Sequence, residues 1–253
     1  MRLPLPRQEL DARIADHLDE LVRLWRAEQG LAKERDLRIL ASSIPFPRDR
    51  AVRALDLACG PGDVGRTIRE TYPQAQVDFV DRDPMLLAIC RGFNEKAGVP
   101  GTYRELDLAD DSWSRELESG AYDVVATANA LHWLDETRAD AVLRDVFGLL
   151  RAGGVFLLAE PASPDSLFAP GFDEWKQRQP PRYEQERWHA FWGRLNSLVG
   201  YDHTMLLGSP EDSRIGDTLT VAGWIELVEN GGFRSVDVLW RDADVVNVAA
   251  ERP

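Results

Sequence analysis

The chain of 253 residues carries 43 acidic against 30 basic side chains, a net charge of −13 at pH 7, and 44% of its residues are apolar. This negative balance opposes a phosphate backbone and argues against a nucleic-acid partner, and no apolar run is long enough to span a membrane. The opening residues are too short and too proline-rich for a signal peptide, and two cysteines do not make a disulfide framework, so we expect a cytoplasmic protein.

Residues 7–28 place apolar side chains at spacings of three and four, which predicts an amphipathic helix that ends near Gly30. A second helix is predicted over residues 31–43, before two prolines stop it. We assign residues 1–48 to an N-terminal helical segment. Trp25 in this segment has two interpretations, either as a ligand contact or as part of the core packing.

The most informative stretch is residues 54–65, which read Ala-Leu-Asp-Leu-Ala-Cys-Gly-Pro-Gly-Asp-Val-Gly. They predict an apolar strand, a turn in which Gly60 and Gly62 reach backbone conformations closed to other residues, and a helix capped by Asp63. A strand, a glycine turn and a helix open a nucleotide-binding α/β sheet. Together with Gly65, the two glycines also satisfy the dinucleotide pattern, which leaves an NAD-dependent enzyme as an alternative at this point.

Two carboxylates frame this turn and weigh against a dinucleotide. Asp56 lies four residues before Gly60, and Asp63 follows the turn. Anions here repel a pyrophosphate, which needs exposed amides and a positive helix end. They suit a ligand whose near end is cationic, such as an ammonium or a sulfonium. The alternative for Asp56 is a structural bond to backbone amides of the turn.

Further acids end the second and third predicted strands. Asp81 ends a strand over residues 77–80, 19 residues after Gly62, where a carboxylate binds both hydroxyls of a ribose. Asp107 ends the next strand, and with the apolar Leu108 it offers an acceptor and a flat face to an adenine. An NAD-dependent enzyme also carries an acidic residue that binds the ribose, so Asp81 alone does not distinguish between the two cofactors.

With these residues the chain resembles the class I S-adenosylmethionine (SAM) dependent methyltransferases. The resemblance covers roughly residues 50–161 and a further stretch from 218 to 250. It implies an α/β fold, a Rossmann-like doubly wound sheet of seven strands with an antiparallel last strand. The run Ala-Leu-His-Trp-Leu is similar to the trans-aconitate-type branch of small-molecule methyltransferases. The matching segments, in chain order, are Leu55 to Gly62, Val80 to Leu86, Asp107-Leu108, Tyr122 to Leu134 and Leu149 to Leu157.

The resemblance implies SAM as the cofactor and assigns residues to each part of it. Asp81 holds the ribose hydroxyls, Asp107 accepts from the adenine amine, and the backbone of Asn129 lies near the ammonium group. The implied cofactor residues, beginning with those at the methionine end, are Asp56, Gly60, Pro61, Gly62, Asp81, Arg82, Asp107, Leu108, Asn129 and Ala130.

The stretch 162–217 interrupts the expected step from the fifth strand to the next helix and carries eight of the 22 aromatic residues. We interpret it as a lid insertion that covers the carboxyl ends of the strands, where open α/β sheets bind ligands. Core packing is the alternative for any single aromatic. Residues 181–199 are predicted to be helical. The methyltransferase core comprises residues 49–161 and 218–253, and its last two predicted strands form a terminal hairpin that a simple dinucleotide domain lacks.

The expected reaction is methyl transfer to a small-molecule acceptor, with oxygen, nitrogen or carbon as the acceptor atom left open. Candidates for a general base are His132 after the fourth strand and His189 and His203 in the lid, each with a bystander role as its alternative. No metal site is expected. Other hypotheses are an enzyme of this fold with a non-methylating reaction such as cyclisation, and a non-catalytic SAM-binding subunit. The oligomeric state stays open. Arginines of the lid that are candidates to clamp a substrate carboxylate are Arg182, Arg187 and Arg194.

Overall fold

The computed structural model describes residues 5–98, 101–178, 185–200, 215, 219–242 and 244–253, without the side chains of residues 28–32 and 185. A seven-stranded sheet with the order β3-β2-β1-β4-β5-β7-β6 forms the centre of the molecule. The strands from β1 to β5 pair in parallel, whereas β7 is antiparallel to both of its neighbours. The strands are β1 (Arg53–Leu57), β2 (Gln76–Asp81), β3 (Gly101–Glu105), β4 (Tyr122–Ala128), β5 (Leu150–Pro161), β6 (Arg234–Asp242) and β7 (Val245–Glu251).

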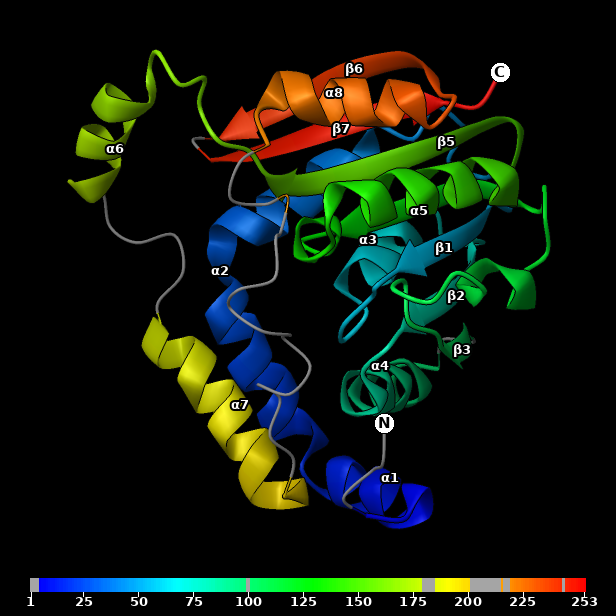
Figure 1. Cartoon of the computed structure of the whole chain (residues 1–253). Helices are drawn as coiled ribbons and strands as arrows, with labels where there is room; N and C mark the ends of the chain where they lie inside the picture. Colours follow the sequence, from blue (N-terminus) through cyan, green and yellow to red (C-terminus); the bar gives the residue numbers. More distant parts are fainter. Residues whose placement is uncertain (1–4, 99–100, 179–184, 201–214, 216–218, 243) are drawn as a thin grey trace.

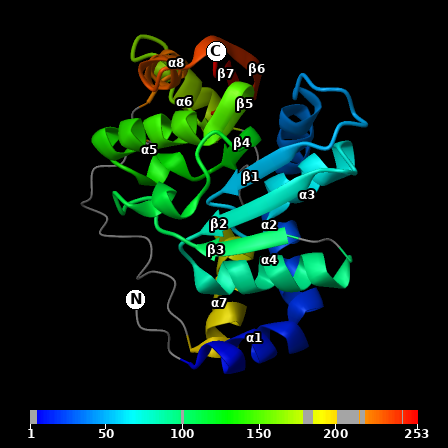
Figure 2. The ribbon, with the colours of Figure 1, turned by 90° about the vertical axis from the view of Figure 1, so that its right-hand side faces the viewer.

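Helices cover both faces of this sheet (Figure 1 and Figure 2). One face packs against α5 (Glu136–Leu149) and α8 (Val221–Asn230), and the other against α2 (Leu18–Ser42), α3 (Asp63–Thr71) and α4 (Pro84–Lys96). Beyond the sheet edge, α1 (Arg7–Asp16) and α7 (Gln185–Val199) pack against α2 and α4. Helix α6 (Ala169–Gln177) lies apart from the sheet in Figure 1 and buries none of its residues. Short 3-10 turns are η1 (Trp113–Glu116) and η2 (Leu131–Trp133).

Each helical layer has its own apolar core. Trp113, Phe156 and Trp224 are almost completely buried between the sheet and the layer that contains α5 and α8. Tyr72 and Phe79 are completely buried on the opposite face. Burial of side chains this large provides much of the stability of an α/β layer structure, at roughly 1.5–3 kcal/mol each. A third core, built by α1, α2, α4 and α7, holds the N-terminal helices over the edge of the sheet.

The fold class expected from the sequence is confirmed, including the antiparallel β7. The helix boundaries in the N-terminal segment were wrong, because the break lies at His17 and not at Gly30. His17 leaves helical geometry at φ −117° and ψ 13°, and its N–H donates to the carbonyl oxygen of Ile14. Gly30 lies inside α2, where packing against α7 outweighs the cost of about 1 kcal/mol of a helical glycine.

Two further boundaries differ from the prediction. Gly62, at φ 86°, takes the N-cap position of α3, and Asp63 is the first helical residue, with its side chain turned to other partners. Helix α6 was not predicted, and of the helix expected over residues 181–199 the structure shows α7, while residues 181–184 lie outside the described part of the chain. No helix among the described residues combines the length and apolar character that crossing a bilayer requires.

Candidate functional site

The carboxyl ends of the parallel strands open onto a cavity of about 530 Å³. Its floor consists of the loops that follow β1, β2, β3 and β4, and helices α2 and α7 contribute aromatic side chains to its walls. A volume of this size lies within the range of about 300–1,000 Å³ typical of small-molecule sites. The residues expected at the cofactor that line it are Gly60, Asp81, Arg82, Asp107, Leu108, Asn129 and Ala130, and Asp56, Pro61 and Gly62 are not among its lining.

The glycine loop after β1 is fixed by its backbone. The N–H of Cys59 donates to the carbonyl of Val80 (2.9 Å), and the N–H of Gly62 donates back to the carbonyl of Cys59 (2.8 Å). Gly60 and Gly62 have φ of 53° and 86°, and a Cβ on Gly62 would lie 2.5 Å from Sγ of Cys90. Ala58 adopts φ 51°, a conformation that is strained for a residue with a Cβ. The loop therefore requires glycine at position 62 for both conformation and space.

Asp56 supports this loop from below. Its Oδ2 accepts a hydrogen bond of 2.7 Å from the N–H of Gly65, and its side chain is completely buried. Burial raises the pKa of Asp56 well above its ordinary value. Its Oδ1 has no hydrogen-bond partner among the described residues. This is the structural bond that the sequence left open as the alternative to direct ligand contact.

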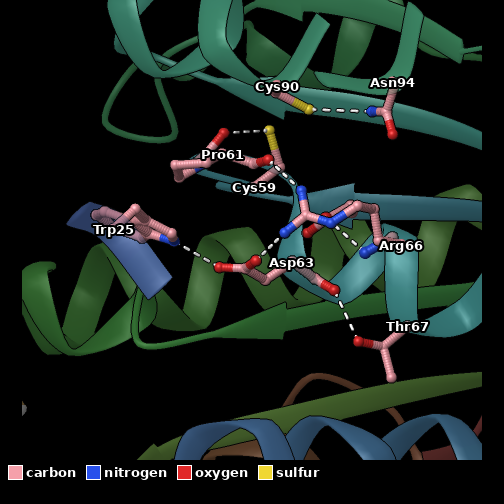
Figure 3. Close-up of polar contacts among 11 residues, drawn as sticks. Trp25, Cys59, Pro61, Asp63, Arg66, Thr67, Cys90 and Asn94 are labelled. Carbon is pink, nitrogen blue, oxygen red and sulfur yellow. Dashed lines mark hydrogen bonds and ion pairs between the residues drawn. The ribbon is translucent and has the colours of Figure 1, made fainter. Parts of the chain in front are cut away.

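Asp63 connects the glycine loop to the N-terminal helices (Figure 3). The indole N–H of Trp25, in α2, donates to Oδ2 of Asp63 at 2.5 Å. Oδ1 of Asp63 forms an ion pair with Arg66, whose guanidinium also donates to the carbonyl of Pro61 at 2.7 Å. The ring of Trp25 lies over Gly60, where an added Cβ would be 3.7 Å from it. Trp25 thus covers the turn, and Arg66 offsets the negative charge of Asp63.

The acids at the end of β2 bind backbone amides. Oδ2 of Asp81 accepts from the N–H of Gly60 at 2.7 Å, and Oδ1 accepts from the N–H of Asp83 at 2.8 Å. Asp83 caps α4 through the N–H groups of Met85 and Leu86. Burial raises the pKa of Asp81, and burial together with the charge of Asp81 raises the pKa of Asp83 to about 7. Asp81 therefore joins the glycine loop to the start of α4 at the cavity.

The loop after β3 provides a flat apolar surface and a carboxylate. Leu108 is buried, and its carbonyl accepts from Nε of Arg138. Asp107 is exposed, and its Oδ1 accepts from the N–H of Ala109 at 2.9 Å. Arg82, after β2, lines the same part of the cavity. The three sequence-predicted residues Arg82, Asp107 and Leu108 are therefore brought together with Asp81.

The loop after β4 is fixed by a buried carboxylate that the sequence analysis missed. Glu160, near the end of β5, is completely buried, and its Oε1 accepts from the N–H groups of Ala130 and Leu131, each at 2.8 Å. Asn129 adopts φ 54°, and its N–H donates to the carbonyl of Ala159 at 2.8 Å. Since these N–H groups are occupied, the carbonyls of the loop are the backbone groups suited to an ammonium. A single acid inside the apolar run Val155 to Pro161 is the signal that identifies Glu160 in the sequence.

His132 belongs to the same network. Its Nδ1 lies 2.7 Å from Oε2 of Glu160, and its ring lines the cavity. A carboxylate accepts hydrogen bonds, so Nδ1 carries the hydrogen and Nε2 is the nitrogen left to accept a proton. An imidazole oriented in this way by a carboxylate has the arrangement of a general base.

The candidate histidines and arginines of the lid do not share the position of His132 in the cavity. His189 is exposed on α7 and is not among the residues that line the cavity, and His203 lies outside the described part of the chain. Arg194 pairs with Glu20 of α2, and Arg187 donates to the carbonyl of Ala27 at 3.1 Å. These two arginines connect α7 to α2, and Arg182 lies outside the described residues.

The described aromatic residues of the lid differ in their placement, and Tyr183 and Tyr201 lie outside the described part of the chain. Trp188 and Trp192 of α7 line the cavity, with ring centroids 5.5 Å apart. Phe191 is completely buried in the core that α1, α2, α4 and α7 share. Phe168 and Trp175 are exposed at α6. In the described part of the chain no group of three or more histidine, cysteine, aspartate or glutamate side chains is arranged to hold a metal ion.

In a comparison with known proteins, residues 54–154 match a family model described as "Methyltransferase domain". The malonyl-[acyl-carrier protein] O-methyltransferase of Laribacter hongkongensis is 31% identical over 134 residues, which cover 51% of this chain and 43% of that protein. The trans-aconitate 2-methyltransferase of Streptomyces avermitilis is 33% identical over 96 residues, or 38% of this chain and 34% of that protein. The chain thus matches less than half the length of either relative.

Solved structures share the fold at lower identity. An O-methyltransferase family protein from Burkholderia thailandensis superposes with a TM-score of 0.60 at 17% identity, over 87% of this chain and 56% of that one. PigF, solved with S-adenosylhomocysteine (SAH), gives a TM-score of 0.55 at 18% identity, over 87% of this chain and 56% of that one. These structures extend the likeness in fold beyond residues 54–154, to most of the chain.

Proposed function

We propose that the chain is a class I SAM-dependent methyltransferase, which binds SAM in the cavity at the strand ends and transfers its methyl group to a small-molecule acceptor. The observation that carries this proposal is the convergence of the strand-end residues Gly60, Asp81, Asp107 and Asn129 on one cavity. Each of these residues follows or ends a different parallel strand. They are therefore brought together in space as well as appearing in the expected order in the sequence.

The residues present fit the cofactor. We assign the cofactor end of the cavity to Gly60, Asp81, Arg82, Asp107 and Leu108. Asp81 accepts from two backbone amides and still lies at the cavity surface, where its carboxylate is placed for ribose hydroxyls. Leu108 offers an apolar surface to an adenine, beside the acceptor oxygens of Asp107. Asp56, Pro61 and Gly62 contribute by shaping the glycine loop from outside the cavity.

The surroundings of the expected methionine end of the cofactor also fit SAM. The N–H groups of Gly60 and Gly62 are occupied within the protein, by Asp81 and by the carbonyl of Cys59, so the glycine turn offers neither amide to a pyrophosphate. Asp63 also lines the cavity, but its charge is offset by Arg66 and does not decide between the two cofactors. Such surroundings suit an ammonium and a sulfonium better than the phosphates of NAD.

Bound SAM supplies an activated methyl group on a cationic sulfur. The protein has to align the acceptor with that methyl and exclude water, and these two effects provide much of the rate in such a transfer. Trp25, Trp188 and Trp192 form an apolar cover that excludes water. His132 removes the acceptor proton at Nε2, and Glu160 orients the imidazole through Nδ1. Methylation of an oxygen or nitrogen that arrives protonated uses this pair.

The remaining features support a small acceptor and an intracellular setting. The net charge of −13 opposes a nucleic-acid substrate. Cys59 and Cys90 are both free and buried, as expected of a protein that works in the reducing cytoplasm.

The proposed reaction is tested by incubating the protein with radiolabelled SAM and pools of small phenols, amines and carboxylic acids, and by measuring SAH release. We expect acceptor-dependent SAH formation, which His132→Asn lowers about 10²–10⁴-fold without a comparable loss of SAH affinity. His189→Asn, measured in the same assay, shows which of the two histidines acts as the base. A large loss with His189→Asn and none with His132→Asn would assign the base to the lid instead. A product formed without net methyl transfer would support the non-methylating alternative.

A further inference from the structure

The charged side chains that line the cavity gather at the end that we assign to the cofactor. Asp81 and Arg82 lie at the end of β2, and Asp107 follows β3. Asp83 lines the same region, and its N–H donates to Oδ1 of Asp81. In the sheet order β3-β2-β1-β4-β5 these residues lie on the side of β3 and β2, away from β5. Their charges therefore belong to the surroundings of the cofactor.

Lys33 and Asp63, which also line the cavity, belong to this end as well. Oδ2 of Asp63 accepts from the indole N–H of Trp25, whose ring lies over Gly60. The ammonium of Lys33 lies 5.5 Å from the centre of the same ring. Both charges are thus held beside the glycine loop, at the cofactor end.

The loops after β4 and β5 form the opposite end of the cavity, which has a different character. Among the described residues, no aspartate, glutamate, lysine or arginine lines it. Glu160 lies behind the loop after β4, completely buried, and is not part of the lining. Its oxygens are already engaged, Oε1 by two backbone amides and Oε2 by Nδ1 of His132. We call this part the acceptor end, and its residues are Ala128, Ala130, His132, Trp133, Leu134 and Pro161.

The acceptor end favours a molecule without charge. A charged acceptor would lose hydration here and find no counter-ion in the described lining, and burial of an unpaired charge is costly. An uncharged ring gains from contact with Leu134, Pro161 and the ring of Trp133. Trp133 is 36% exposed, and its ring centre lies 5.0 Å from that of His132. A flat molecule packed on Trp133 therefore lies beside the imidazole.

The imidazole of His132 favours a hydroxyl as the reacting group. Glu160 keeps the hydrogen of His132 on Nδ1, so Nε2 accepts a hydrogen bond from a ligand. A hydroxyl oxygen becomes strongly nucleophilic only as its proton leaves, whereas a carboxylate has no proton to lose and a neutral amine attacks before it loses one. A phenolic hydroxyl, with a pKa of about 10 like that of tyrosine, gives its proton to an imidazole more readily than an alkyl alcohol does.

We infer that the acceptor is an uncharged phenol, which donates its hydroxyl hydrogen to Nε2 of His132 and packs its ring against Trp133, Leu134 and Pro161. The inference rests on the proposed function, because it takes the other end of the cavity to be occupied by the cofactor. The transfer needs no further reactant. The hydroxyl oxygen takes the methyl group, the electron pair of the broken carbon–sulfur bond stays on sulfur, and the hydroxyl proton passes to Nε2.

The test uses the whole chain saturated with SAH and calorimetric titration at pH 7 with four probes that share one ring system. These are 2-naphthol (an uncharged phenol), 2-methoxynaphthalene (uncharged, without the hydroxyl), 2-naphthoate (anionic) and 2-(aminomethyl)naphthalene (cationic). We expect 2-naphthol to bind at least about tenfold more tightly than either charged probe, because each of these buries an unpaired charge. Equal or tighter binding of a charged probe, or no saturable binding of 2-naphthol, would overturn the inference.

The hydrogen bond to His132 is tested separately. In the parent chain 2-naphthol should bind about fivefold more tightly than 2-methoxynaphthalene, which is the effect of one hydrogen bond. His132→Phe should remove this difference, because the phenylalanine ring fills the same space without an acceptor nitrogen. Retention of the difference in His132→Phe would show that the hydroxyl lies elsewhere in the cavity.

A cation introduced at the acceptor end tests the selection against charge. Leu134→Lys should lower the preference for 2-naphthol over 2-naphthoate by at least about tenfold, since its ammonium supplies the counter-ion. The matched control is Leu167→Lys, at a side chain that is 77% exposed and does not line the cavity. It should leave all four affinities unchanged. Equal effects of the two lysines would contradict the assigned location.

Failure of the inference and failure of the proposed function give different results. Each variant is first titrated with SAH, and an affinity like that of the parent chain shows that it is folded. If SAH binds and 2-naphthol does not, the acceptor class is wrong and the methyltransferase proposal stands. If SAH does not bind to the folded parent chain, the proposed function fails, and the acceptor inference fails with it.

Discussion

Nδ1 of His132 lies 2.7 Å from Oε2 of Glu160, and the other carboxylate oxygen of Glu160 accepts from two backbone amides, those of Ala130 and Leu131. One completely buried side chain therefore fixes both the ring of the proposed base and the loop that carries it. Its position near the end of β5, next to β4 in the sheet, explains how the loop after β4 keeps its shape across the cavity.

Glu160→Ala should destabilise the protein by about 2–6 kcal/mol, because the N–H groups of Ala130 and Leu131 lose their acceptor at roughly 1–3 kcal/mol each. Glu160→Gln should cost less, about 1 kcal/mol, since its amide oxygen still accepts from both N–H groups. Urea unfolding followed by circular dichroism measures the difference. Equal stability of the alanine and glutamine variants would show that these hydrogen bonds do not hold the loop.

The stability of the folded chain should depend on the ionisation of Asp83. Its pKa is raised to about 7 in the folded state, first by burial and then by the charge of Asp81, against about 3.9 in an unfolded chain. Between these two values the folded state keeps a proton that the unfolded state has lost, so the free energy of unfolding falls as the pH rises from about 4 to 7. The full effect of the shift is at most about 4 kcal/mol.

Asp83→Asn removes this dependence and keeps a side chain that caps α4 well. The variant should therefore gain stability relative to the parent protein as the pH rises, with the difference largest at pH 8. Urea unfolding at pH 5, 6, 7 and 8 measures both curves. Parallel curves would mean that Asp83 ionises at its ordinary pH in the folded protein.

Ala58 carries strain that glycine would relieve. At φ 51°, a left-handed alanine costs roughly 1–2 kcal/mol, while glycine costs roughly 0.5–1 kcal/mol in chain entropy. Ala58→Gly should therefore stabilise the protein by up to about 1 kcal/mol. Ala54→Gly, in β1, is the matched control and should destabilise. A loss of stability in Ala58→Gly would show that contacts of its methyl group with the core outweigh the backbone strain.

The two thiols should be inert in the folded protein. Burial and the neighbouring Cys90 raise the pKa of Cys59 well above its ordinary value, so little thiolate is present to react. Iodoacetamide at pH 8 should modify neither Cys59 nor Cys90 until urea unfolds the chain, as mass spectrometry of the labelled protein can show. Rapid labelling of the native protein would contradict the packing of Cys90 against Gly62.

Local patterns in the sequence were sufficient to predict the sheet and the residues at its strand ends. Asp81 and Asp107 end or follow parallel strands, and the carboxyl ends of parallel strands meet at one edge of a sheet, so their proximity follows from the predicted topology. The partners of the two acids that flank the glycine turn could not be predicted in this way. Asp56 points to the amide of Gly65 and Asp63 is offset by Arg66, and neither partner is specified by the spacing of the acids.

Contacts between distant segments could not be predicted in the same way. Glu160 meets His132 across 28 residues, and Trp25 meets Asp63 across 38. Such pairs depend on how loops and helices pack around the sheet, and local propensity does not determine that packing. The break at His17 and the continuous helix through Gly30 have the same cause, because tertiary packing of α2 overrides the preference of single residues.

The most direct measurement is a calorimetric titration of the folded, ligand-free chain with SAH, with NAD as the control. We expect one micromolar SAH site and no NAD binding, and a loss of about 1–3 kcal/mol of binding free energy in Asp81→Ala. Asp173→Ala, which removes an exposed carboxylate of α6, should bind SAH like the parent chain. Absence of SAH binding, or equal binding of NAD, would contradict the assignment of the cavity to SAM.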